Sequence, residues 1–221
     1  YSESIQRRIV AHYYAAISLI DDNVGRLVKA LEETGQLENT IVVFTADHGE
    51  FLGNHGLLRK PSFHYDETMR VPLLLRGPGI TPGREVDGLV ELVDLYPTLM
   101  GLLGAGGPEA HPGVQGRDFS AALADGSPIG REDVYADMYD MDPMVAARAS
   151  GPYGACLTLR TEAWKLSVYP DEDRPCGQLF DLAADPGESR NLFDDSAHRA
   201  DRDRLLWRLL GRRHRNADLL P

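Results

Sequence analysis

The stretch Ile41-Val-Val-Phe-Thr-Ala-Asp47-His48-Gly49-Glu50 decides the fold, because an apolar, β-branched run ends abruptly in a carboxylate, an imidazole and a glycine. Such a run predicts a buried strand over 41–46. Open α/β sheets bind ligands at the carboxyl ends of their strands, which is where these polar residues fall. Asp47 and His48 offer two adjacent metal ligands, and Lys60 offers a cation for an anionic substrate. The plainer alternative is a polar turn in which His48 only makes hydrogen bonds.

The composition of the 221 residues limits the possible functions. Apolar residues make up 43%, enough for a substantial core, and 23 Lys plus Arg against 34 Asp plus Glu give a formal net charge of −11. This balance argues against nucleic acid as the main partner, because phosphate binding needs a basic face. It does not argue against an anionic small substrate, since one lysine or metal ion can dominate a pocket. No apolar run is long enough for a transmembrane helix, and the two cysteines, Cys156 and Cys176, imply no disulfide framework.

The first part of the chain alternates helical and extended patterns. Apolar residues at helical spacing predict a helix over 11–34, ended by Gly35 in a left-handed conformation. The strand over 41–46 follows, then a long loop over 49–65 and a second strand over 71–76. A helix that crosses to a strand is half of a βαβ unit, so we expect a mainly parallel sheet here.

The pattern changes beyond Gly126. Before it, Asp94 is expected to cap a helix over 95–103. After it, short strands follow one another without helices between them, which predicts an antiparallel sheet. These strands cover 134–138, 156–160, 164–168 and 178–182. A final helix is expected over 196–214, and the simplest interpretation of its arginines over 208–215 is a solvated helix end.

Motifs along nearly the whole chain resemble the sulfatase family of the alkaline phosphatase superfamily, in order and in spacing. They lie at 14–25, 40–50 with the downstream Lys60, 70–79, 93–99, 115–118, 159–166, and 179–188 with 191–192. The resemblance implies an α/β, alkaline-phosphatase-like sandwich. Residues 1–125 would form the second half of its mainly parallel sheet with flanking helices, and residues 126–221 a small antiparallel-sheet subdomain with a terminal helix.

The resemblance also implies a sulfuric ester hydrolase, similar to arylsulfatases, that acts on a small-molecule or saccharide sulfate ester. Sulfatases use a formylglycine made from the Cys or Ser of a Cys/Ser-x-Pro-x-Arg motif. That motif is absent, as is the N-terminal pair of metal-binding aspartates. The chain thus looks like a C-terminal portion with about half of an active site. We expect this portion alone to be inactive, and to self-associate or need its N-terminal half. The compartment stays open.

The site residues implied by the resemblance lie around the quoted stretch. Asp47 and His48 would bind one divalent metal ion; imidazole suits manganese, zinc or iron, while carboxylates keep calcium or magnesium possible, and calcium or manganese is expected. Lys60 matches the catalytic lysine that contacts the sulfate group. His55 is expected to support the metal ligands without binding the metal itself, with simple packing of the loop as the alternative. His64 is expected to line the substrate mouth.

Two other functions stay open at this point. A phosphonate monoester or phosphodiester hydrolase of the same superfamily shares the Asp-His pattern and the downstream lysine. A non-catalytic binding module could also have inherited the fold. Loss of activity in an Asp47→Ala variant would separate an enzyme from such a module.

Overall fold

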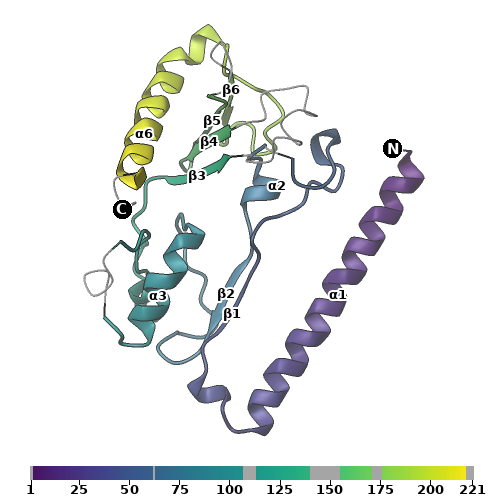
Figure 1. Cartoon of the computed structure of the whole chain (residues 1–221), viewed down its shortest axis with the longest axis vertical. Helices are drawn as coiled ribbons and strands as arrows, with labels where there is room; N and C mark the ends of the chain where they lie inside the picture. The colour runs from purple at the N-terminus through teal and green to yellow at the C-terminus, as the bar shows by residue number, and fades with distance from the viewer. Residues whose placement is uncertain (1, 62, 107–112, 140–154, 171–175, 218–221) are drawn as a thin grey trace. The chain divides into compact units, whose positions relative to one another are not determined.

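The computed structural model describes residues 2–61, 63–106, 113–139, 155–170 and 176–217. Contacts divide the chain into two compact units (Figure 1). The first unit comprises residues 1–61 and 65–82, and the second comprises residues 62–64 and 83–221. Each unit is described by itself.

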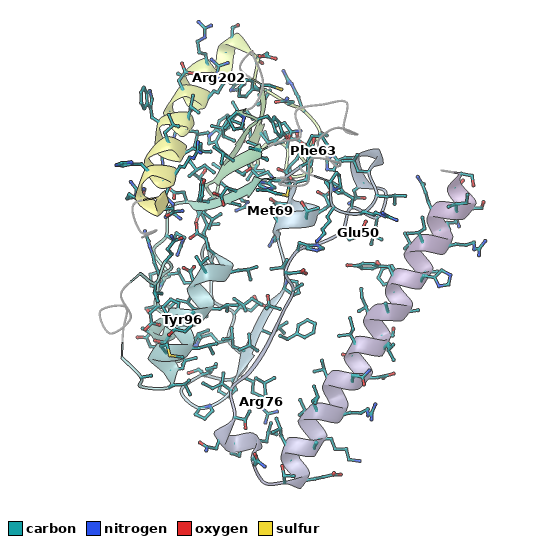
Figure 2. The ribbon with its side chains drawn as sticks, in the orientation of Figure 1. Glu50, Phe63, Met69, Arg76, Tyr96 and Arg202 are labelled. Carbon is teal, nitrogen blue, oxygen red and sulfur yellow. The ribbon has the colours of Figure 1, made fainter. Side chains whose placement is uncertain are left out.

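The first unit begins with one long helix, α1 (Glu3–Glu33). Its end confirms the role expected of Gly35, which has a φ of 66°. The Gly35 and Gln36 N–H groups donate to the carbonyls of Glu32 (3.0 Å) and Leu31 (2.8 Å), the pair of bonds that defines a Schellman cap. The helix starts earlier than the predicted residue 11, and its side chains stand around the whole rod (Figure 2). None of its residues is buried.

The two strands of the first unit are β1 (Val42–Thr45) and β2 (Leu73–Arg76), preceded by the short helix η1 (Leu37–Asn39). They pair antiparallel, Val42 opposite Arg76 and Thr45 opposite Leu73. The α/β class is confirmed, but the parallel pairing expected here is wrong for these two strands. The reason is the connection between them, whose described residues form no helix besides η2 (Asn54–Gly56) and the one-turn helix α2 (Asp66–Met69). A parallel crossover normally carries a longer helix across the sheet.

The predicted antiparallel sheet is confirmed in the second unit. Its four strands follow one another in the order β3-β4-β5-β6, each antiparallel to the next. They are β3 (Val134–Tyr139), β4 (Ala155–Arg160), β5 (Trp164–Val168) and β6 (Gly177–Asp181). The terminal helix α6 (Arg199–Ala217) follows η5 (Ser196–His198) and lies along this sheet (Figure 1).

Apolar side chains fill the space between α6 and the sheet. The core consists of Leu157, Leu159, Leu166, Leu179, Leu192, Phe193, Leu205 and Leu209. Arg202, labelled near the start of α6 in Figure 2, closes one end of it. Its Nη1 donates to the Phe193 carbonyl (2.9 Å), and its guanidinium lies 5.2 Å from the centre of the Phe193 ring, which is within the range of a cation–π contact.

A buried ion cluster joins the remaining helices of the second unit to this sheet and to α6. Asp94, at the end of η3 (Leu92–Asp94), does not cap the following helix α3 (Leu95–Leu102) as predicted. It is 1% exposed, accepts from the Arg117 N–H (2.7 Å) and pairs with Arg131 (2.5 Å). Asp94 thus holds the chain before α4 (Ser120–Asp125) and accepts from the Glu91 N–H (2.7 Å) in the capping box of η3, instead of capping α3.

The arginines of α6 also differ from the predicted solvated helix end. Arg212 pairs with Glu91, and Arg208 pairs with Asp133. Arg212 is only 13% exposed, because these pairs hold α6 against the cluster. The domain boundary at residues 125 and 126 stays a prediction; the compact units divide at residue 82, since these ion pairs tie the region of α3 to the C-terminal part.

Candidate functional site

The Asp-His-Gly turn after β1 brings the predicted metal-binding atoms of Asp47 and His48 close together. The His48 Nδ1 lies 2.8 Å from the Gly49 carbonyl oxygen. Since a carbonyl only accepts, this nitrogen carries the proton and Nε2 keeps its lone pair. The Asp47 Oδ2 lies 3.4 Å from that Nε2, and the Asp47 side chain is 83% exposed. A nitrogen lone pair and a carboxylate oxygen therefore lie side by side on an accessible surface.

Lys60 completes this group. Its Nζ lies 2.5 Å from the His48 Nε2, so the ammonium donates to the lone pair. The predicted metal ligands and the predicted sulfate-binding lysine are therefore adjacent, although twelve residues separate Lys60 from His48. The contact fixes the imidazole from its second side, while the Gly49 carbonyl fixes the first.

Gly49 has a packing role that the sequence reasoning missed. Its N–H donates to the Thr68 carbonyl (2.9 Å). A Cβ on Gly49 would lie 1.9 Å from the Glu67 carbonyl oxygen, a backbone atom that a rotamer change cannot move. Only glycine lets the turn approach α2 this closely.

The loop that carries Lys60 is compact and strained. Leu52, His55 and Arg59 all have positive φ, between 51° and 64°. Positive φ is uncommon outside glycine, and such strain collects at functional sites. The fully buried Phe51 anchors the loop, and its N–H donates to the Arg59 carbonyl (3.2 Å). This hydrogen bond between Phe51 and Arg59 thus closes the loop directly before Lys60.

His55 helps to hold this loop in place. Its ring stacks on Tyr65 at 4.1 Å and meets Phe51 edge-on at 6.1 Å. Its Nε2 lies 3.3 Å from the Glu67 Oε1, which also accepts from the Asn54 side chain (3.1 Å). These contacts match the loop-packing alternative, and support of the metal ligands through the loop stays a prediction. Nothing in the sequence singled out Glu67.

His64 belongs to the second unit and is 6% exposed. Its Nδ1 lies 2.8 Å from the Thr158 Oγ1 and 3.5 Å from the Cys156 Sγ. Burial, helped by the positive charge of nearby Lys165, lowers the pKa of His64 to about 4. The ring is neutral at pH 7, so any contact with an anionic substrate would be a hydrogen bond and not an ion pair. Its place at the substrate mouth stays a prediction.

Cys156 lies against the same histidine. Burial raises the pKa of its thiol to about 11. The thiolate is the nucleophilic form of cysteine, so Cys156 is no nucleophile at neutral pH.

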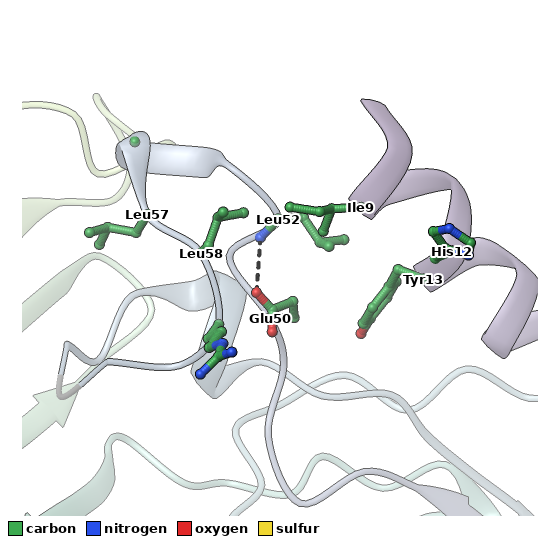
Figure 3. Close-up of a pocket in the computed structure, with 9 residues that line it drawn as sticks. Ile9, His12, Tyr13, Glu50, Leu52, Leu57 and Leu58 are labelled. Atoms are coloured by element: carbon green, nitrogen blue, oxygen red, sulfur yellow. Dashed lines mark hydrogen bonds between the residues drawn. The ribbon is translucent and has the colours of Figure 1, made fainter. Parts of the chain in front are cut away.

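Beside the loop lies a cavity of about 830 Å³ (Figure 3). Residues from α1 and from the loop line it: Ile9, His12, Tyr13, Glu50, Leu52, Gly56, Leu57, Leu58 and Arg59. The Glu50 Oε1 accepts from the Leu52 N–H (3.4 Å), which directs this carboxylate back to its own loop. The lining is mostly apolar and contains neither Asp47, His48 nor Lys60.

Asp47 and His48 fit a divalent metal ion by their chemistry. The tautomer of His48 presents Nε2 as a metal ligand and uses Nδ1–H to orient the ring, the usual arrangement of metal-bound histidine. Thr45, two residues before Asp47, keeps a buried hydroxyl with no hydrogen-bond partner among the described residues. The described residues contain no group of three or more His, Cys, Asp or Glu side chains that could hold a metal ion.

No described helix is long and apolar enough to cross a membrane.

Comparisons with known proteins identify the family to which the chain is similar. The Sulfatase family model matches residues 1–105. Arylsulfatase K of Xenopus laevis is 34% identical over 192 residues, which are 87% of this chain and 35% of that protein. The chain thus spans about a third of the length of this curated relative.

Two solved structures extend the likeness to the fold. One is a protein in complex with its substrate D-glucosamine-2-N,6-O-disulfate, 30% identical, with a TM-score of 0.79 over 93% of this chain and 40% of that one. The other is a phosphonate monoester hydrolase from Silicibacter pomeroyi, 34% identical, with a TM-score of 0.75 over 89% of this chain and 39% of that one. Membership of the sulfatase family generally implies a divalent metal and a formylglycine. From the motifs, the fold and these relatives, the chain belongs to the sulfatase family of the alkaline phosphatase superfamily.

Proposed function

We propose that this chain is part of a hydrolase that cleaves sulfate monoesters. The observation that supports it is the convergence of the His48 Nε2, the Asp47 carboxylate and the Lys60 ammonium at one exposed turn. A cation site next to a mobile ammonium suits an anionic group that gains charge during the reaction. Arylsulfatase K and the disulfated glucosamine complex, as similar proteins, support a saccharide or other small sulfate ester as the substrate.

In this proposal Asp47 and His48 hold one divalent cation. When bound, the cation supplies Lewis-acid polarisation of a sulfate oxygen and stabilises an alkoxide nucleophile. Calcium or manganese is the proposed metal, because one imidazole among oxygen ligands is compatible with both. The nucleophile, a formylglycine, and the other ligands would come from residues outside these 221.

Lys60 is the proposed catalytic and substrate-binding residue. Its ammonium would donate to a sulfate oxygen or to the leaving oxygen and offset the negative charge there. The loop contacts of His55 and Glu67 keep the backbone before Lys60 fixed. His64 would act as a neutral hydrogen-bonding group at the substrate mouth.

A phosphonate monoester hydrolase is the second candidate, favoured by the likeness to the Silicibacter pomeroyi enzyme. A phosphonate monoester also presents anionic oxygens on a tetrahedral centre, so the same cation and lysine could serve it.

The decisive experiment measures how fast the full-length protein releases 4-nitrophenol from two substrates, 4-nitrophenyl sulfate and 4-nitrophenyl phenylphosphonate. We expect kcat/KM for the sulfate to fall more than about 100-fold in Asp47→Ala and by roughly 100-fold or more in Lys60→Met. Exposed controls on α1, Asp21→Ala and Lys29→Met, should retain activity. Faster turnover of the phosphonate would favour the second candidate, and full activity of Asp47→Ala would refute the site. The 221 residues alone should release no product.

We also propose that the isolated 221 residues self-associate. No residue of α1 is buried, and Tyr14 and Leu27 are 62% and 67% exposed. Apolar surface of this extent favours association. Light scattering should show species larger than 24.4 kDa, and a monomer over the whole concentration range would contradict the proposal.

A further inference from the structure

We propose that Lys60 occupies the metal-binding nitrogen of His48 in the metal-free protein and leaves it when the cation binds. This inference rests on the proposed function, because it takes Asp47 and His48 as the metal ligands. It adds a second role for Lys60, whose three donors all become available to the sulfate group once the cation has displaced it.

The hydrogen-bonding capacity of the two side chains supports this exchange. An ammonium group has three donors and no acceptor. The Lys60 Nζ therefore uses the lone pair of the His48 Nε2, at 2.5 Å. The other ring nitrogen is committed to the Gly49 carbonyl at 2.8 Å. His48 has a single lone pair in the ring plane to offer, so the ammonium and a metal ion compete for it.

The surroundings allow Lys60 to move while His48 stays. Lys60 is exposed and lies after the loop, on a flexible stem of four methylene groups. His48 is held by the bond from its ring to the Gly49 carbonyl, and Gly49 is packed against the Glu67 carbonyl. The cation thus meets a pre-oriented imidazole and has to displace only a side chain.

The exchange lowers the apparent metal affinity of the free protein. Only molecules in which Lys60 has left Nε2 can bind, so the apparent dissociation constant is the intrinsic one divided by the fraction of such molecules. Without the ammonium, the His48 Nε2 should be free to bind the cation in every molecule. A charge-assisted hydrogen bond of ordinary strength corresponds to roughly a tenfold change.

The test is the dissociation constant of Mn²⁺ for the full-length protein, measured by electron paramagnetic resonance of the free ion. We expect Lys60→Met to bind Mn²⁺ roughly tenfold more tightly than the unaltered chain. The matched control is Arg59→Met, which removes a positive charge one residue away and leaves the contact with His48 in place. It should change the constant less than about twofold, as expected for a screened surface charge. Equal tightening in both variants would mean a general charge effect and would overturn the proposal.

A second measurement needs no metal. The ¹⁵N resonance of the His48 Nε2 should differ between the metal-free unaltered chain and Lys60→Met, and should not differ in Arg59→Met. An unchanged Nε2 resonance in Lys60→Met would overturn the contact itself. The Asp47→Ala variant separates the two proposals. If Asp47→Ala loses Mn²⁺ binding while Lys60→Met and the unaltered chain bind Mn²⁺ equally tightly, the metal site stands and only the displacement is refuted. Absence of Mn²⁺ binding in every variant refutes the metal site and the displacement together.

Discussion

The two units of the chain differ in how completely each covers its own apolar side chains. The second unit buries eight core residues between α6 and the antiparallel sheet, each 6% exposed or less. The first unit contains a helix of 31 residues of which none is buried. The proposed metal ligands Asp47 and His48 lie in this first unit, with Lys60. The comparison teaches that the C-terminal unit covers its own core, whereas the unit with the proposed site leaves a whole helix exposed.

The largest difference between the two units is expected in the free energy of unfolding that is lost when a charged residue is replaced. The Arg131 side chain is 1% exposed and pairs with Asp94 and Glu91. Arg131→Met should lower the free energy of unfolding by about 3–5 kcal/mol, because it removes the buried positive charge that these two carboxylates share. Arg7→Met on α1, whose pair with Glu3 is 80% and 77% exposed, should cost less than about 0.5 kcal/mol. Urea unfolding followed by circular dichroism measures both, and similar costs would break the comparison.

Apolar side chains should show the next largest difference. Leu166 is fully buried under α6. Leu166→Ala should lower the free energy of unfolding by about 2–5 kcal/mol, through lost burial and the cavity left behind. Ile17, 45% exposed on α1, should cost within about 0.5 kcal/mol in Ile17→Ala, since little burial is lost and alanine favours helix. A cost above about 2 kcal/mol for Ile17→Ala would show that α1 is covered in solution, for example by self-association.

A smaller effect should appear as a pH dependence of the second unit. His64 has a pKa of about 4 in the folded protein against 6.5 unperturbed, so the unfolded chain binds more protons between these values. Stability is full above pH 6.5 and falls as the pH drops toward 4, by at most roughly 3 kcal/mol. His64→Gln should flatten this slope, with His12→Gln on exposed α1 as the control. Equal slopes of unfolding free energy from pH 4.5 to 7 in His64→Gln and the unaltered chain would contradict the assignment.

The sequence predicted those features that depend on local pattern. Hydrophobic periodicity and turn residues located α6, the four strands β3 to β6 and the Gly35 cap, because each follows from neighbouring residues. The Asp47-His48 turn and Lys60 were found through motif spacing, and the structure places them in contact.

The features that the sequence did not predict depend on partners far along the chain. The antiparallel pairing of β1 with β2 follows from a 27-residue connection without a crossover helix, running from Ala46 to Pro72. Asp94 looked like a helix cap because its buried partner Arg131 lies 37 residues away. Glu67 and the close approach of Gly49 were invisible for the same reason, since each is defined only by the packing of α2 on the loop.

Electron spin echo measurement of the Mn²⁺-loaded full-length protein tests most directly whether His48 is a metal ligand. We expect ¹⁴N modulation from one imidazole nitrogen, which disappears in His48→Gln and persists in His55→Gln. A Mn²⁺ signal without nitrogen modulation, or modulation that survives in His48→Gln, would contradict the site proposed here.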